Sequence, residues 1–290
     1  MPRIPVYVLI VTYNRLEWLK EAIESIPTDP STHIFILDNA STDGTTSYLE
    51  TTYHGPYTHK FYRPANLPGA FAHLLEHLPL AATPLQDYYI CLFADDDHML
   101  PNGIEAKRIM LDQNPSLGLV FSRVRLMDAN SNDLGISPMG HIFDEDRPTG
   151  ALSFYDLILG DYIPMPSVMF RLSMFSQHIH LLGSTVFGPT TDWQLWLSGA
   201  ADAMDGGYIH EPTVSLRQHP GQDSAIHSNN GTYLAYHMVV WEYWLEQGWS
   251  PDPESQLRIH DFIKNIAAFP ALTRFQGALH KAHKRRTTAI

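Results

Sequence analysis

Apolar and polar positions along the first 130 residues follow two alternating periods. Continuous apolar runs predict buried strands at 6–14, 33–40 and 88–94, and weaker extended patterns predict two more at 60–66 and 118–129. The segments between them place apolar side chains at helical spacing, as Leu16, Leu19 and Ile23 do. We therefore predict helices at 15–26, 45–53, 69–78 and 102–113. Such an alternation is typical of a mostly parallel α/β sheet flanked by helices.

The second half of the chain loses this regularity. A loop with Gly and Pro (135–150) precedes a helix, and extended stretches follow. The aromatic segment 232–249 and the tail after it predict a C-terminal helical extension. We expect the middle segment to complete the sheet and to add a second lobe.

Composition narrows the class of protein. The 290 residues are 44% hydrophobic, enough for a large core, and no stretch approaches the ~20 apolar residues of a transmembrane helix. The N-terminus has no small-residue cleavage site, so we expect no signal peptide. The single cysteine, Cys91, excludes an intrachain disulfide and fits a reducing, cytoplasmic setting.

The charge balance argues against nucleic-acid binding. The net charge is −12, whereas phosphate contacts require clustered Lys and Arg. The exception is the basic C-terminus, which carries Lys281, Lys284, Arg285 and Arg286. This patch is either a solvated helix end or a surface for weak peripheral contact with an anionic membrane.

Polar residues gather where the predicted strands end. Tyr13 and Asn14 follow the first strand, Asp38 and Asn39 the second, and Asn66 the third. Three adjacent aspartates, Asp95, Asp96 and Asp97, follow the fourth. Because ligands of open α/β sheets bind outside the carboxyl ends of the strands, these ends predict one shared site.

The aspartate triplet allows two readings. It is a solvated loop in which one Asp caps the next helix, or it is a site for a hard cation. The chain has neither a G-x-G-x-x-G nor a P-loop sequence, so it lacks the usual protein cradles for phosphate. A divalent ion held by carboxylates, Mn²⁺ or Mg²⁺, is then the natural partner of a phosphorylated ligand.

Taken in order, seven segments resemble glycosyltransferase family 2, whose members have the GT-A fold. They are VLIVTYNR, FILDNASTDGT, NLPGAFAHLL, FADDDHMLP, IPMPSVMFR, TDWQLWL and LRQHPGQDS, and they extend from residue 6 to about residue 224. Single segments of this kind are weak signals, whereas seven in the same order are specific. The resemblance implies an inverting glycosyltransferase that uses a nucleoside-diphosphate sugar.

The resemblance also implies roles for individual residues. Asp192 stands at the position of the catalytic base, and a divalent metal falls to Asp96, Asp97 and His219, with the register on the triplet left open between Asp96 and Asp97. The implied nucleotide- or donor-binding residues are Val11, Tyr13, Asn14, Asp38, Asn39, Asn66, Gly69, Asp95, Asp96 and Arg217.

Two positions depart from the pattern of the family. Thr191 replaces the Glu that usually precedes the base, although Asp192 itself is retained. His73 and Leu74 occupy the region of an Arg-Asn pair, which puts in question how the donor sugar is gripped. Asp192 also has a structural alternative as the N-cap of the following helix.

The expected reaction is metal-dependent transfer of a sugar from a UDP- or dTDP-sugar, with GDP-sugars left open. The acceptor is a hydroxyl of a saccharide or lipid-linked saccharide. The implied division of the chain is a nucleotide-sugar-binding half (1–130), an acceptor and catalytic half (131–228), and the helical extension (229–290).

Other functions share parts of this pattern. A haloacid-dehalogenase-type phosphatase carries its D-x-D after the first strand and follows it with Thr or Val, where this chain has Met99. A sugar-nucleotide pyrophosphorylase requires a Gly-rich N-terminal loop that is missing. A catalytically silent nucleotide-sugar or glycan-binding module stays open, because only the base at Asp192 separates it from an enzyme.

Overall fold

The computed structural model describes residues 3–78, 87–137, 157–184, 186–229 and 232–253, together with 255–257 and 259. The basic C-terminal patch, most of the 135–150 loop and residues 260–290 lie outside the described residues. Within the described part, no helix is long and apolar enough to span a bilayer.

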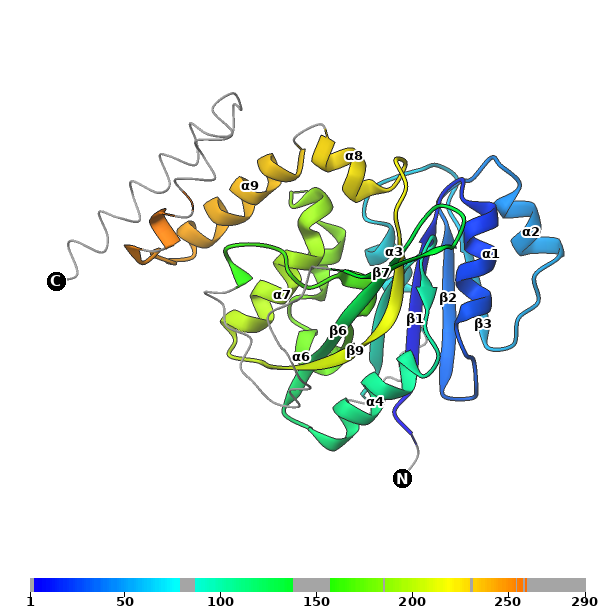
Figure 1. Cartoon of the computed structure of the whole chain (residues 1–290), viewed down its shortest axis with the longest axis horizontal. Coiled ribbons are helices and arrows are strands. Elements are labelled where there is room, and N and C mark those ends of the chain that lie inside the picture. Colours follow the sequence, from blue (N-terminus) through cyan, green and yellow to red (C-terminus); the bar gives the residue numbers. More distant parts are fainter. Residues whose placement is uncertain are drawn as a thin grey trace.

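One mixed sheet organises the molecule (Figure 1). Its strands run in the order β3-β2-β1-β4-β8-β6-β9-β5, with β7 paired to β6. The strands are β1 (Val6–Thr12), β2 (Thr32–Asp38), β3 (Thr58–Tyr62), β4 (Tyr89–Ala94), β5 (His98–Met99), β6 (Leu117–Met127), β7 (Asp133–Ile136), β8 (Met169–Arg171) and β9 (Asp205–Arg217). The strands β1 to β4 are parallel, whereas β8 is antiparallel to both of its neighbours.

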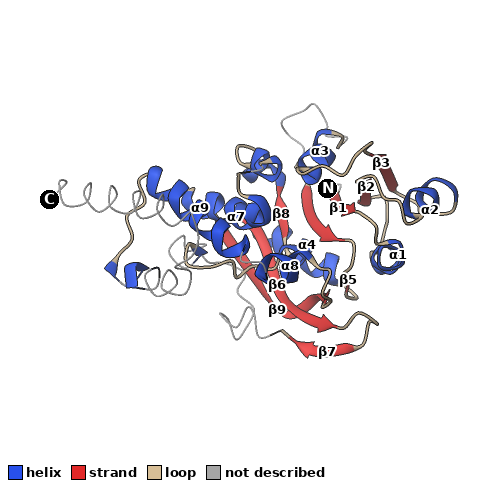
Figure 2. Cartoon of the chain, turned by 90° about the horizontal axis from the view of Figure 1, so that it is seen from above, coloured by secondary structure: helices blue, strands red, loops and turns tan. Residues whose placement is uncertain are grey.

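Helices cover both faces of this sheet. They are α1 (Leu16–Ser25), α2 (Thr45–Thr51), α3 (Ala70–Glu76), α4 (Gly103–Gln113), α6 (Leu172–Phe175), α7 (Thr191–Ala201), α8 (Asp223–Asn229) and α9 (Thr232–Glu246). Short 3₁₀ turns are η1 (Met165–Ser167), η2 (Ile179–Gly183) and η3 (Gly188–Thr190). Viewed along the sheet, α1 and α3 lie on opposite sides of β1 and β2 (Figure 2).

The two apolar cores follow from the two-residue period of the strands. On β1, Val8 and Ile10 point into the core shared with α1 and α4, whereas Tyr7 and Leu9 point into the core shared with α3, α7 and α9. Because both faces of the central strands are covered, these strands read as continuous apolar runs in the sequence. The strongest sequence signals therefore coincide with the centre of the sheet.

The predicted elements of the first half are all present, with ends shifted by a few residues. The second half completes the sheet as expected, chiefly through β9, which pairs in parallel with β6. The short strand β5 was not predicted. It consists of His98 and Met99, directly after the aspartate triplet. Its pairing with β9 holds the triplet next to the C-terminal end of β9.

Candidate functional site

The site lies where β4 ends. Asp95, Asp96 and Asp97 follow Ala94, the last residue of β4, and all three are less than 7% exposed. Three adjacent carboxylates are therefore held inside the protein and not in a solvated loop. Burial of like charges is costly unless cations or hydrogen bonds compensate it, so the surroundings of the triplet decide its chemistry.

Two basic side chains converge on the same oxygen of Asp96. Arg15 donates from Nη1 to Oδ1 of Asp95 and to Oδ2 of Asp96, both at 2.9 Å. His219 places Nε2 3.0 Å from Oδ2 of Asp96. The Nη2 group of Arg15 also donates to the carbonyl of Gly221, at 3.0 Å. The turn after β1 and the loop after β9 thus meet at Asp96.

Charge at the triplet is incompletely balanced. Burial raises the pKa of Asp95 to about 6; the Arg15 guanidinium opposes this shift and the Asp96 charge adds to it. Burial, followed by the charge of Asp96, raises the pKa of Asp97 well above its usual range. The Arg15 guanidinium is hydrogen-bonded to the carboxylates of Asp95 and Asp96. A bound cation would offset the cost of holding these ionised carboxylates together inside the protein.

A divalent metal suits one part of this arrangement. Asp96 and His219 supply a carboxylate oxygen and an imidazole nitrogen that already converge, a donor pair suited to Mn²⁺. Oδ1 of Asp97 instead accepts the backbone N–H of Arg217 at 2.9 Å. In the described part of the chain no cluster of three or more acidic, His or Cys side chains is arranged around one point. Further ligands would have to come from a bound diphosphate and water, as is common for Mg²⁺-type sites.

A second polar cluster forms beyond β2. Asp38 is 1% exposed; its Oδ1 accepts the backbone N–H of Ser41 at 3.0 Å, and its Oδ2 accepts the hydroxyl of Thr46. Asn39 donates from Nδ2 to Oδ1 of Asn66 at 2.6 Å. The predicted residues Asp38, Asn39 and Asn66 therefore lie together and hold the loops after β2 and β3.

The remaining donor-side predictions surround this cluster. Oδ1 of Asn14 accepts the backbone N–H of Thr42 at 2.7 Å, and Asn14 itself has a positive φ of 54°. Tyr13, directly after β1, is 42% exposed. Val11 pairs with Leu37 and Ala94 in the sheet.

Gly69 precedes α3 with φ +71°, and a Cβ there would lie 3.3 Å from the carbonyl oxygen of Gly183. A left-handed φ of this kind favours glycine. The backbone conformation alone therefore explains why glycine occupies position 69, with or without a role in ligand binding.

Asp192 lies in the first turn of α7, and the N-cap of this helix is Thr190, not Asp192. Burial raises the pKa of Asp192 to about 6, although N–H groups of the first turn oppose the shift. Nearby, Oδ1 of Asp161 is buried without a hydrogen-bond partner. Burial and then the charge of Asp192 raise the pKa of Asp161 well above its usual range. Both acids are half-buried, and each carboxylate disfavours ionisation of the other.

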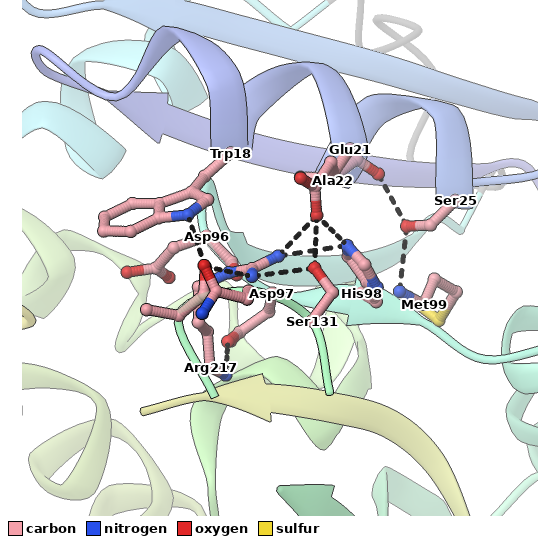
Figure 3. Close-up of polar contacts among 12 residues, drawn as sticks. Trp18, Glu21, Ala22, Ser25, Asp96, Asp97, His98, Met99, Ser131 and Arg217 are labelled. Atoms are coloured by element: carbon pink, nitrogen blue, oxygen red, sulfur yellow. Dashed lines mark hydrogen bonds and ion pairs between the residues drawn. The ribbon is translucent and has the colours of Figure 1, made fainter. Parts of the chain in front are cut away.

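Arg217 does not point to open space. It is 2% exposed, and each of its three guanidinium nitrogens has a protein partner: Nε the carbonyl of Asp96, Nη1 the hydroxyl of Ser131, and Nη2 the carboxylate of Glu21. Figure 3 shows these contacts around the end of β9. This environment differs from that of a side chain exposed to a diphosphate.

Several residues of the site were not predicted from the sequence. Arg15 follows Tyr13 and Asn14 directly, so its place beside the triplet was within reach of the same strand-end argument. Glu21, Trp18 and Asp161 carried no such signal. Their roles depend on packing between segments far apart in the chain, which spacing alone does not reveal.

Comparison with known proteins gives one family match. The model described as "Glycosyl transferase family 2" matches residues 7–175, more than half of the chain. The match includes the triplet but ends before Asp192, Arg217 and His219. No curated protein matches the chain.

Solved structures with the same fold have low sequence identity. TarS 1–349 of S. aureus, in complex with UDP-GlcNAc, is 12% identical with a TM-score of 0.63, and the match covers 96% of this chain and 79% of that one. The mannosyltransferase PcManGT from Pyrobaculum calidifontis, in complex with GDP-Man and Mn²⁺, is 15% identical with a TM-score of 0.61, covering 98% and 76%. Against a longer TarS structure, the chain spans only 44% of that protein. The chain has the GT-A fold of these glycosyltransferases.

Proposed function

The chain belongs to glycosyltransferase family 2, and we propose that it transfers a sugar from a nucleoside-diphosphate donor to a hydroxyl of a saccharide or lipid-linked saccharide. One observation carries the proposal beyond the family. The buried triplet at the end of β4 meets Arg15 and His219, and this places negative charge, a guanidinium and an imidazole at the ligand edge of the sheet.

The nucleobase and ribose are assigned to the cluster beyond β1 and β2. We place the imide edge of uracil or thymine at Asp38 and Asn39. The Asp38 oxygens already accept from Ser41 and Thr46, so they would accept from the base through their remaining lone pairs. Tyr13, half-exposed at the mouth of this cluster, is placed to pack near the base. We therefore favour UDP or dTDP, and Asp95 as the contact to the ribose. The solved structures of the same fold with UDP-GlcNAc and GDP-Man support a nucleotide-sugar donor in general.

The diphosphate is assigned to the edge near Asp96. We propose that Asp96 and His219 hold Mn²⁺ or Mg²⁺ and that Arg15, beside them, contributes a positive charge to the same region. A bound metal supplies Lewis-acid stabilisation of the negative charge that grows on the leaving diphosphate. The complex of PcManGT with Mn²⁺ supports a metal in this fold.

The proton of the acceptor hydroxyl is assigned to Asp192. In an inverting displacement the hydroxyl attacks the anomeric carbon as the bond to the diphosphate breaks, and a carboxylate takes the proton. A pKa raised to about 6 by burial makes Asp192 a better base than an exposed aspartate. Burial and the charge of Asp192 raise the pKa of the neighbouring Asp161, which favours its neutral form beside an ionised Asp192.

A nucleotide screen tests the proposed function. Melting temperatures are measured with UDP, dTDP, GDP and their sugars, each with Mn²⁺ and with EDTA. We expect UDP or dTDP compounds to raise Tm only when Mn²⁺ is present, because ligands that bind the folded state stabilise it by mass action. A chain that no nucleoside diphosphate stabilises would refute the assignment.

The pKa of Asp192 predicts the acid limb of the reaction. Asp192 must be ionised to accept a proton, so kcat/KM for the acceptor, at saturating donor, stays constant above about pH 7 and falls below about pH 6. The fall approaches about tenfold per pH unit, as for one essential base. A pH series from 5 to 8.5 measures it, and a rate that is flat to pH 5 contradicts the assigned base.

A further inference from the structure

We propose that Arg217 is a positioning residue, which holds Asp96 and His219 in place for metal binding and does not contact the donor. The inference rests on the proposed function and revises the expectation that Arg217 binds the diphosphate. Its basis is a set of contacts that we call the Arg217 clamp, formed by Trp18, Glu21, His98, Ser131 and Arg217 (Figure 3).

The clamp joins Arg217 to the triplet at two points. The backbone N–H of Arg217 donates to Oδ1 of Asp97 at 2.9 Å, and its Nε donates to the backbone carbonyl of Asp96 at 2.7 Å. These bonds restrain the chain at Asp96 without using its carboxylate. The Oδ2 atom of Asp96 faces Arg15 and His219 instead.

The rest of the guanidinium is anchored away from the site. Nη1 donates to Ser131 Oγ at 2.9 Å and to the carbonyl of Ala129 at 3.2 Å, in the turn between β6 and β7. Nη2 donates to Oε2 of Glu21, on α1, at 2.7 Å. A guanidinium with five donors in a fixed plane can satisfy such divergent acceptors at once, whereas an ammonium cannot.

Glu21 is the anion of the clamp. Burial tends to raise its pKa, but hydrogen bonds from Ser131 and Arg217 together with the Arg217 charge lower it below the usual value. The same Oε2 atom lies 3.0 Å from Nε2 of His98, on β5. The charge of Arg217 is therefore neutralised within the clamp, and no carboxylate of the triplet is needed as its counter-ion.

Trp18 connects the clamp to the imidazole. Its ring lies 4.1 Å from the ring of His219, centroid to centroid, and 5.6 Å from the guanidinium carbon of Arg217. Arg217 also precedes His219 by two residues at the end of β9. Side chains that orient a metal ligand from behind tune metal affinity even though they never touch the ion.

Replacing Arg217 with Lys tests the inference. Lysine keeps the charge but cannot bond Asp96, Ser131 and Glu21 together. The probes are UDP and Mn²⁺, with UDP dissociation constants measured by calorimetry in Mn²⁺ and in EDTA. We expect the Mn²⁺ concentration for half-maximal UDP binding to rise by about 10–100-fold, the range for outer-shell changes, while UDP affinity in EDTA is unchanged.

Two further variants accompany it. Arg125→Lys is the matched control, because Arg125 lies on β6 in an exposed ion pair with Asp133, and it should bind as the parent does. Glu21→Gln loosens the clamp from a half-exposed position on α1 and should shift the Mn²⁺ requirement in the same direction by a smaller factor. It decides the matter if Arg217→Lys does not fold.

The outcomes separate the inference from its premise. A parental Mn²⁺ requirement in both clamp variants, or an equal loss of UDP binding with and without Mn²⁺, overturns the role of Arg217. If the parent binds neither UDP nor GDP in any metal-dependent way, the proposed function itself fails, and the inference falls with it.

Discussion

Replacing Asp192 with Asn lowers kcat for sugar transfer by about 10²–10⁴-fold and leaves the affinity for the donor unchanged. The amide is nearly isosteric with the carboxylate but cannot accept a proton, so the variant removes the general base and little else. Donor affinity is assigned to the ends of β1, β2 and β4, none of which includes Asp192. A transfer assay measures kcat, and calorimetry measures the dissociation constant of the donor.

Stability distinguishes this loss from misfolding. Burial raises the folded-state pKa of Asp192 to about 6, above its ordinary value, so the ionised side chain destabilises the fold as pH rises through that range. A neutral Asn avoids this cost, and the Tm of Asp192→Asn at pH 8 should equal or exceed that of the parent.

The matched control lies at the other end of the same helix. Asp202 is the C-cap of α7, and its side chain is 58% exposed in a pair with His178. Asp202→Asn should transfer sugar at the parent rate. If Asp192→Asn does so as well, the base is misassigned, and if the parent itself transfers nothing, the silent binding module gains support.

Much of the fold could be predicted because its central strands are buried on both faces. Runs such as 6–14 and 88–94 need no partner to be recognised, since a covered parallel strand is apolar throughout. The short strand β5 has only His98 and Met99, too few residues for a period, and its existence depends on pairing with β9.

The residues of the site also fall into those that the strand ends predict and those that depend on long-range contacts. Asp38, Asn39 and Asn66 were predicted to lie together because strand ends of a parallel sheet meet at one edge, and they do. The contacts of Arg217 with Glu21 on α1 and Ser131 in the β6–β7 turn join residues more than 80 positions apart. No local pattern encodes such contacts, and the contact of Arg217 with a diphosphate was implied by the family resemblance alone.

The register of metal binding on the triplet, which the sequence left open, has a geometric preference that mutation can test. Within the triplet, it is Asp96 whose carboxylate oxygen lies within hydrogen-bond distance of the His219 imidazole. The carboxylate of Asp97 instead accepts the backbone N–H of Arg217. We therefore expect Asp96→Asn to abolish the Mn²⁺-dependent rise in Tm with UDP and to lower kcat by about 10²–10⁴-fold, because several kcal/mol of leaving-group stabilisation are lost.

The neighbouring variant is the matched control for this last prediction. Asp97→Asn retains an oxygen that can accept the N–H of Arg217, so the turn should keep its geometry and the variant its Mn²⁺ requirement. The same nucleotide screen and transfer assay, applied to both variants, compare two isosteric changes one residue apart. Loss of metal dependence in Asp97→Asn with its retention in Asp96→Asn would reverse the register. Equal loss in both would mean that the ion is shared, which the separate bonding of the two carboxylates argues against.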